Sequence, residues 1–268
     1  MRTESITSAQ NPKIKMLLAL GEKSRTRREN ALFIVEGRLE IKHCIDAGSK
    51  ALFVCRDIIS DKDFNEIAEL CSGQCSCYEV TQNVYEKIAY RSGTEGIIAE
   101  IEMKEKSLED VKLRENPLVV VLESVEKPGN LGAVLRTADA ADADAVIICD
   151  PLTDLFNPNL IRASLGAVFT RQVVAATSGE TLKWLNDNNI KIYTAQLQDS
   201  SWYYDTDMTC GTALVMGTEH DGLSTFWRMH ADAHVKIPML GQMDSLNVSV
   251  SSAILMFEAV RQRHSSKK

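Results

Sequence analysis

The segment V-K-I-P-M-L-G-Q-M-D-S-L-N-V-S-V-S-S-A-I-L-M-F-E-A-V-R-Q-R (residues 235–263) joins a short apolar strand to a long helix through a polar loop. Apolar residues alternate as far as Met239, Gly241 turns the chain, and helical spacing of apolar residues starts after Asn247. Small polar residues crowd the helix N-terminus, where free backbone N–H groups attract a side-chain oxygen or an anionic ligand. The loop therefore either caps the helix or binds a ligand.

Continuous apolar runs recur upstream of this segment, at residues 118–122 (L-V-V-V-L), 145–149 (A-V-I-I-C) and 213–216 (A-L-V-M). Such runs are typical of strands that are buried on both faces of a parallel sheet. With the helical patterns between them, they predict an α/β domain of five or six parallel strands in a doubly wound sheet. Ligands of such sheets bind beyond the carboxyl ends of the strands. We therefore expect three loops to meet there: residues 123–132, 217–222 and 241–249.

Shorter strands and helices alternate in the N-terminal part of the chain. Strands are predicted at residues 31–36, 52–55 and 96–101, and helices at 39–47 and 61–71. This alternation predicts a small α/β module. The charged stretch that follows is closed by Pro117 and marks a boundary. The predicted division is an N-terminal domain at 1–105, a linker at 106–116 and a second domain at 117–268.

Composition narrows the class of protein. The 268 residues carry a net charge of −7, which argues against a protein that coats nucleic acid non-specifically. No run of 18 apolar residues occurs, and the first residues contain no apolar signal region, so we expect a cytosolic protein without a membrane span. Basic residues outnumber acidic ones only near the N-terminus. The stretch E-K-S-R-T-R-R-E-N there is either a solvated helix face or a segment that binds phosphates.

Seven cysteines are scattered along the chain. This odd number is typical of free thiols in a reducing compartment. Cys71, Cys75 and Cys77 form a C-x3-C-x-C pattern, but neither a second cysteine pair nor histidines lie at the spacing of a zinc site. We therefore predict no metal.

The loop after the first long strand carries the pattern E-x6-N-L-G-A-V-L-R. It is expected to place Asn130 and Gly132 at a strand-to-helix turn, with Arg136 one helical turn further on. The arginine fork suits a phosphate, although a salt bridge with Asp139 or Glu123 is an equal alternative. Neither G-x-G-x-x-G nor G-x4-G-K-[ST] is present, so the usual dinucleotide and nucleoside-triphosphate sites are excluded.

The second loop, G-T-E-H-D-G (residues 217–222), places two glycines around a carboxylate directly after a buried strand. Glycines allow close approach of the backbone to a ligand, and Glu219 could orient a donor or a cation. A plain turn has the same composition. A histidine on a loop is most often simply solvated, so His220 is left outside the predicted site.

Together, N-L-G-A-V-L-R-T-A, V-M-G-T-E-H-D-G-L and I-P-M-L-G-Q-M-D-S-L-N-V-S-V with the closing F-E-A-V-R-Q-R resemble, in order and spacing, the three motifs of the SpoU/TrmH family of RNA ribose 2′-O-methyltransferases. The resemblance covers residues 117–263. The N-terminal part is more loosely similar to the L30e-like substrate-binding module of ribosomal-RNA members. The resemblance implies a homodimeric, S-adenosylmethionine-dependent enzyme with a C-terminal trefoil knot (the SPOUT fold) and no metal. Periodicity alone indicates only the parallel sheet.

The resemblance also implies site residues, position by position. The catalytic positions are Asn130, Arg136, Glu219, Ser245 and Asn247. The cofactor-binding positions are Thr194, Ala195, Met216, Gly217, Glu219, Ile237, Pro238, Met239, Leu246 and Ser249. RNA-binding positions are Arg136 and, in the basic stretch, Lys23, Arg25, Arg27 and Arg28. Thr218 departs from the family pattern, in which asparagine is frequent, and this bears on the substrate more than on the chemistry.

The hypothesis that follows is in-line attack of a ribose 2′-oxygen on the sulfonium methyl, a reaction that needs alignment and the handling of one proton. Arg136 holds the adjacent phosphate and stabilises the developing alkoxide, Ser245 and Asn247 orient it, and a water or phosphate takes the proton. The expected substrate is ribosomal RNA of the 23S type. The alternatives are a transfer RNA ribose 2′-O-methyltransferase or a non-catalytic RNA-binding or ribosome-assembly factor.

Overall fold

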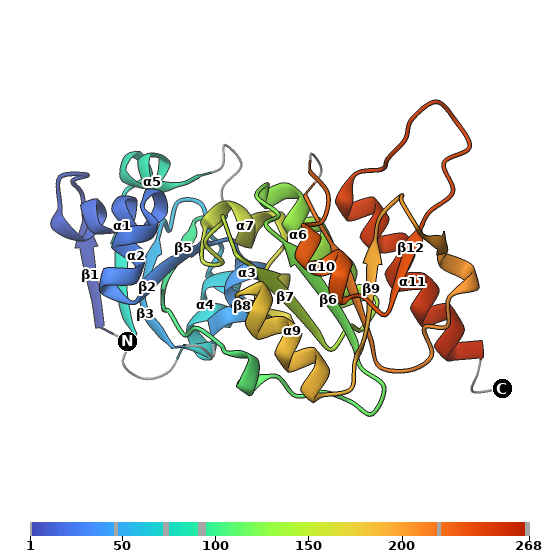
Figure 1. The fold of residues 1–268 in the computed structure, drawn as a ribbon. Helices are drawn as coiled ribbons and strands as arrows, with labels where there is room; N and C mark the ends of the chain where they lie inside the picture. The colour runs from blue at the N-terminus through green and yellow to red at the C-terminus, as the bar shows by residue number, and fades with distance from the viewer. Residues whose placement is uncertain (1, 46–47, 72–74, 91–94, 219–220, 266–268) are drawn as a thin grey trace. The chain divides into compact units, whose positions relative to one another are not determined.

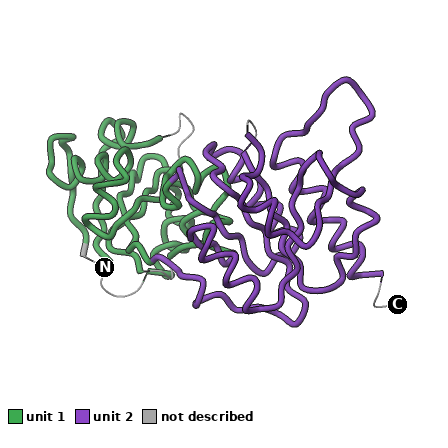
Figure 2. Tube along the Cα trace, in the orientation of Figure 1, with its two compact units in different colours: residues 1–104, 154–170 green, residues 105–153, 171–268 purple. Residues whose placement is uncertain are grey.

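The computed structural model describes residues 2–45, 48–71, 75–90, 95–218 and 221–265. Figure 1 shows the order of the helices and strands along the chain. The chain divides into two compact units (Figure 2). Unit 1 contains residues 1–104 and 154–170, and unit 2 contains residues 105–153 and 171–268.

Unit 1 is built on a mixed five-stranded sheet of order β1-β4-β3-β5-β2. The pairs β1/β4 and β3/β4 are parallel, whereas β5 runs antiparallel to both of its neighbours. The strands are β1 (Arg2–Ile6), β2 (Leu32–Glu36), β3 (Ser49–Val54), β4 (Ser76–Val80) and β5 (Ile97–Glu102). The helices between them are α1 (Pro12–Glu22), α2 (Ser24–Asn30), α3 (Arg38–Cys44), α4 (Asp61–Leu70) and α5 (Gln82–Ile88).

The α/β character of this module is as predicted, but β1, β4 and α5 have no counterpart in the sequence analysis. β4 has the sequence S-C-Y-E-V, and only its second and fifth residues are buried, so it lacks a continuous apolar run.

Unit 1 also contains two short helices that follow β7 of unit 2 in the chain, α7 (Pro158–Ala163) and α8 (Ala167–Thr170). Phe156 and Phe169 lie against Phe33 of β2, with ring centroids 5.0 Å and 5.4 Å apart. The apolar pattern of residues 159–168 predicts a single helix, but Leu165 and Gly166 both have positive φ, which no helix continues through, so two helices form.

Unit 2 contains a seven-stranded sheet of order β10-β12-β9-β11-β6-β7-β8, in which every described pairing is parallel. The predicted parallel α/β sheet is therefore confirmed. Buried aliphatic side chains of the central strands form the core, as their apolar runs indicate. The strands are β6 (Leu118–Glu123), β7 (Ala145–Cys149), β8 (Gln172–Ala176), β9 (Lys191–Ala195), β10 (Ser201–Trp202), β11 (Thr212–Met216) and β12 (Ala233–Lys236).

The helices of unit 2 are α6 (Pro128–Ala140), α9 (Ser178–Asp187), α10 (Thr225–His230) and α11 (Val248–Ser265), with short 3-10 turns η2 (Leu108–Asp110) and η3 (Tyr203–Asp205). Helix α6 begins at Pro128, because proline is well suited to a first helical position. Asn130 and Gly132 therefore lie inside the helix and not in the turn before it, which corrects the prediction. The last strand ends at Lys236, ahead of Pro238, and does not extend to Met239 as predicted.

None of the helices in the described part combines the length and apolarity needed to cross a bilayer.

Candidate active site

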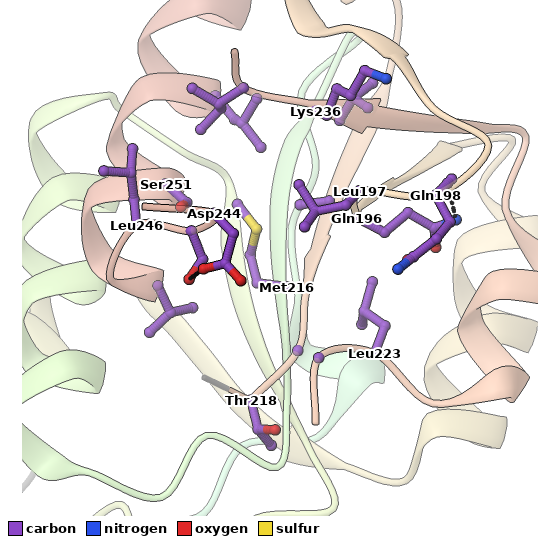
Figure 3. A pocket seen from close by; sticks show the side chains of 18 of the residues that line it. Gln196, Leu197, Gln198, Met216, Thr218, Leu223, Lys236, Asp244, Leu246 and Ser251 are labelled. Carbon is purple, nitrogen blue, oxygen red and sulfur yellow. Dashed lines mark hydrogen bonds between the residues drawn. The ribbon is translucent and has the colours of Figure 1, made fainter. Parts of the chain in front are cut away.

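A cavity of about 390 Å³ lies at the carboxyl ends of β9, β11 and β12 (Figure 3). Its walls come from residues 195–198 after β9, 216–218 and 221–223 around the second loop, 235–237 and 239 at the end of β12, and 244–246 before α11. The two loops that contain residues 217–222 and 241–249 thus meet where the parallel-sheet rule places them.

The end of β6 and the first turn of α6 are joined by side-chain hydrogen bonds to Ser224, just after the second loop, and to the third loop. Asn247 Nδ2 donates to Asn130 Oδ1 over 3.1 Å. The buried carboxylate of Glu123 accepts from the backbone N–H of Ser224 at 2.8 Å and from its hydroxyl at 2.6 Å. Three segments that are distant in the sequence are therefore fastened together at one end of the sheet.

The second loop requires glycine at its first position. Thr218 and Gly222 exchange two backbone hydrogen bonds of 3.1 Å, and Gly222 has φ of +68°. A Cβ on residue 217 would lie 2.1 Å from the carbonyl oxygen of Gly222, well inside contact distance. Gly217 can therefore bring bare backbone to the cavity wall, where any side chain would push the turn apart.

The third loop both caps a helix and contributes to the cavity. Asn247 Oδ1 accepts from the N–H of Ser249 at 2.9 Å and from its hydroxyl at 2.6 Å, so Asn247 caps the N-terminus of α11. Ser245 lines the cavity and donates to Asp244 Oδ1 at 3.1 Å. Both interpretations of this loop therefore apply: Asn247 caps the helix, and Ser245 lines the cavity.

Arg136 is exposed on α6, outside the cavity wall. Within the described residues it forms no hydrogen bond or ion pair. Of the two carboxylates considered as partners, Asp139 binds Arg171 at 2.8 Å and Glu123 holds Ser224. The salt-bridge alternative is therefore wrong, and the guanidinium is available to an anion.

Six of the residues expected at the cofactor line the cavity: Ala195, Met216, Gly217, Ile237, Met239 and Leu246. Thr194, Pro238 and Ser249 lie outside its wall. The hydroxyl of Thr194 is buried, 2.6 Å from Nδ1 of His234, because the two residues are direct partners on the neighbouring strands β9 and β12. Glu219 and His220 fall outside the described residues.

Sequence reasoning missed other residues of the wall, among them Gln196, Gln198 and Arg228. The glutamines directly follow β9, so the rule for strand ends could have found them. Nε2 of Gln196 donates to the carbonyl of Gln198 at 2.9 Å, which shapes this part of the wall. Arg228 is carried by α10, a helix too short to give a clear periodic signal. In the part of the chain that the structure covers, no three His, Cys, Asp or Glu side chains are placed to hold a metal.

The basic stretch near the N-terminus forms α2. Lys23, Arg25 and Arg28 are exposed on it, with Arg25 paired to Glu29 at 2.6 Å. Arg27 is only 3% exposed, binds Asp154 at 2.7 Å and donates to the carbonyl of Leu20 at 2.6 Å. The expectation that Arg27 contacts RNA is therefore corrected, because its guanidinium is buried among partners of its own unit.

Comparisons with known proteins match both parts of the chain. Residues 117–257 match the SpoU rRNA Methylase family, and residues 11–99 match the MRM3-like substrate binding domain. The chain is 28% identical over 254 residues to the 23S rRNA (guanosine(2553)-2'-O)-methyltransferase RlmP of Bacillus subtilis, over 95% of this chain and 98% of the relative. It is 35% identical over 198 residues to the 23S rRNA (guanosine-2'-O-)-methyltransferase RlmB of Vibrio vulnificus, over 72% and 80%.

Among solved structures, the AdoMet-bound rRNA methyltransferase from Sinorhizobium meliloti is similar with a TM-score of 0.87 and 29% identity, over 97% of this chain and 98% of that chain.

Proposed function

The chain belongs to the SpoU rRNA methylase family, and we propose that it transfers a methyl group from S-adenosylmethionine to a ribose 2′-hydroxyl of 23S-type ribosomal RNA. The observation that carries the proposal is the meeting of the three family motifs at one end of the parallel sheet, around a cavity and beside Arg136, which has no partner among the described residues. The relatives named above act on 23S rRNA, and the similar structure from Sinorhizobium meliloti holds AdoMet.

The cavity fits the proposed cofactor. Its volume of about 390 Å³ lies in the range of small-molecule sites. Met216 and Leu246 offer apolar surface, the bare backbone of Gly217 permits close approach, and Asp244 supplies a negative charge for a cationic ligand. When bound, S-adenosylmethionine supplies an activated methyl group. The protein must hold it and bring one ribose hydroxyl into line with it.

We assign the alignment of the RNA to the residues beside the cavity. Arg136 carries a planar cationic guanidinium, which binds the phosphate next to the target ribose and stabilises negative charge on the 2′-oxygen. A hydrogen bond of 3.1 Å joins Asn247 to Asn130 and orients both side chains at the edge of this site. Ser245 and Glu219 are the remaining residues of the proposed catalytic set. The proton passes to water or phosphate, since a guanidinium cannot accept it.

We propose that the N-terminal and C-terminal parts of the chain have separate functions. Residues 1–105 bind the RNA substrate and residues 117–268 carry out methyl transfer. Residues 106–116 are the linker between these two parts. Support comes from the match of residues 11–99 to a substrate binding domain and from three exposed cations, Lys23 directly before α2 and Arg25 and Arg28 on it. An RNA substrate of this class also implies action in the cytoplasm.

A trefoil knot and a homodimer belong to the same proposal. Helix α11 packs against α6 and β11, although β9 separates β12, the strand that precedes α11, from β11. Such a crossing is what a knotted C-terminus would require. The dimer is supported by apolar side chains that α11 presents to solvent, Val250 and Phe257, which are 46% and 47% exposed.

The test is transfer of labelled methyl from S-adenosylmethionine to undermodified 23S rRNA and, in parallel, to bulk transfer RNA, followed by nucleoside analysis. We expect label in a 2′-O-methyl nucleoside of the ribosomal RNA. Label in transfer RNA alone would make transfer RNA the proposed substrate. Cofactor binding without any methyl transfer would favour the non-catalytic assembly factor, and no cofactor binding at all would overturn the enzyme proposal.

A further inference from the structure

Among the described residues of the cavity wall, four side chains are charged, two of each sign. Asp221 and Asp244 are acidic, and Arg228 and Lys236 are basic. The proposed cofactor carries a positive sulfonium and, at its amino-acid end, an ammonium and a carboxylate. The acidic side chains suit the positive groups. The single carboxylate needs a basic partner, because a charge that leaves water without one is costly, and the wall offers two candidates.

Arg228 is held beside the cavity by the packing of its helix, α10. Its neighbour Trp227 is fully buried, and the indole Nε1 donates to Ser178 Oγ at 3.1 Å. Consecutive helical residues point about 100° apart, so the burial of Trp227 leaves Arg228 exposed. Its guanidinium nitrogen Nη2 lies 3.8 Å from the position that a Cβ on Gly222 would occupy. The guanidinium therefore lies beside the second loop, whose residues line the cavity.

The two basic side chains differ in what they already contact. The ammonium of Lys236 lies 4.7 Å from the centre of the Trp202 ring, a cation–π contact with the neighbouring strand β10. The guanidinium of Arg228 has no ion pair or hydrogen bond among the described residues, although two carboxylates belong to the same wall. A planar guanidinium in this state is available to a carboxylate, which it can bind through two parallel hydrogen bonds.

We propose that Arg228 binds the carboxylate of S-adenosylmethionine and lets the protein distinguish this cofactor from ligands that lack the carboxylate. The inference rests on the proposed function, and it adds a residue that lies between the second and third family motifs and belongs to neither. Arg136 is outside the cavity wall and is left to bind an RNA phosphate. The two arginines thus have separate anionic ligands.

The inference predicts opposite effects on two related ligands. Decarboxylated S-adenosylmethionine keeps the adenosine, the sulfonium and the ammonium but lacks the carboxylate, so it has two net positive charges where the intact cofactor has one. Arg228 attracts the intact cofactor through its carboxylate and repels the decarboxylated compound. Removal of the guanidinium should therefore weaken binding of the first ligand and not of the second.

The test is calorimetric binding of both compounds to the full-length protein, without RNA and without turnover. Arg228→Ala should bind S-adenosylmethionine about tenfold more weakly than wild type, as expected for one charge-assisted contact that is open to solvent. Its affinity for the decarboxylated compound should be equal to that of wild type or higher. Equal weakening of both ligands would overturn the proposal, because Arg228 would then only shape the cavity.

Two further variants serve as controls. Arg228→Lys keeps the charge but loses the planar fork, so it should recover part of the affinity for S-adenosylmethionine. Lys236→Ala removes the other basic side chain of the wall and should not discriminate between the two ligands. Selective loss of S-adenosylmethionine binding in Lys236→Ala would assign the carboxylate to Lys236 and contradict the proposal. The melting temperature of Arg228→Ala without ligand should equal that of wild type, since no described residue pairs with the guanidinium.

Affinity for undermodified 23S rRNA, measured on the same variants, separates this inference from the proposed function. If Arg228→Ala weakens RNA binding and leaves cofactor affinity unchanged, the guanidinium binds a phosphate, and the inference is wrong while the proposed function stands. If wild type binds S-adenosylmethionine and Arg228→Ala binds both compounds as wild type does, the inference alone is wrong. If wild type binds neither compound, the proposed function fails and the inference fails with it.

Discussion

The two ends of the strands in unit 2 differ in how their charged and polar groups are used. At the amino ends, Arg263 donates to the carbonyls of Met208, Pro117 and Cys210 over 2.8–3.1 Å. The carboxylate of Asp144, 2% exposed, accepts from the N–H of Leu118 at 2.8 Å and binds Arg114 at 2.8 Å. At the carboxyl ends, side-chain hydrogen bonds also join the segments, but a cavity lies among them and Arg136 is exposed.

This difference teaches that one end of a sheet can be filled with paired charges while the other end keeps a cavity and an exposed cation. Groups that already have partners contribute to folding, whereas groups without partners can bind a ligand when it arrives. If the comparison is right, substitutions at the carboxyl ends should change activity with little loss of stability. Substitutions at the amino ends should do the reverse.

The largest effect is expected at Arg136. Arg136→Ala removes the cation proposed to hold the phosphate and to stabilise the 2′-oxygen, so kcat should fall by about 10²- to 10³-fold. The melting temperature should stay unchanged, because the side chain contacts no partner within the described residues. Methyl transfer under single-turnover conditions and thermal unfolding measure the two quantities.

Arg136→Lys keeps the charge but loses the planar fork, so most of the activity should still be lost. Near-normal turnover of the lysine variant would contradict bidentate binding of the phosphate. A large drop in melting temperature for either variant would show that Arg136 stabilises the fold. That result would contradict the proposed difference between the two ends of the sheet.

Asp144 at the opposite end should show the reverse pattern. Asp144→Asn weakens the hydrogen bonds to Arg114 and Leu118, which should cost about 1–3 kcal/mol of unfolding free energy. Cofactor affinity should be unchanged, since the residue lies at the far end of the strands. Asp142→Asn is the matched control, because Asp142 also binds Arg114 but is 65% exposed, and its loss should cost at most about 1 kcal/mol.

The same residue gives the stability a pH dependence. Burial opposes the charged form of Asp144, but hydrogen bonds from Arg114 and from two backbone N–H groups outweigh it and lower its pKa. Its stabilising contribution is therefore complete above the unfolded pKa of about 4 and is lost as the pH falls through the lower folded value. Urea unfolding of wild type from pH 6 to pH 3 should show this loss, and Asp144→Asn should reduce it.

The parallel sheet of unit 2 and the position of its cavity could be predicted because continuous apolar runs and the strand-end rule depend only on local sequence. Family membership followed from three motifs. The contacts that decide individual roles could not be predicted. Arg27 and Arg28 are adjacent in one basic stretch, yet Arg27 is buried against Asp154, a partner 127 residues away.

Elements that lack periodicity were also missed. β4 has no continuous apolar run, and α10 has only six residues. The excursion of residues 154–170 into unit 1 depends on aromatic contacts with Phe33, which no local pattern reports. The sequence therefore predicted where the cavity lies more successfully than which side chains line it.

Asn247 refines the comparison, because it is both a residue that stabilises the fold and a proposed catalytic residue. It caps α11 through Ser249 and also holds Asn130. Asn247→Ala should cost about 1 kcal/mol of unfolding free energy through the lost cap and should also lower kcat. Asn130→Ala removes the contact between the two asparagines and leaves the cap, so it should lower kcat with a smaller change in stability. Equal stability losses in both variants would show that the mutual contact, and not the cap, stabilises this edge.

The smallest effect is expected in unit 1, where the same distinction separates neighbouring arginines of α2. Arg28→Glu reverses an exposed charge and should weaken RNA binding about threefold, with a shallower dependence on salt and unchanged cofactor affinity. Arg27→Ala should instead lower the melting temperature, because it leaves the carboxylate of Asp154 without its partner. If Arg28→Glu binds RNA as wild type does at every salt concentration, then α2 is a solvated face, and exposure without a partner does not by itself identify a binding cation.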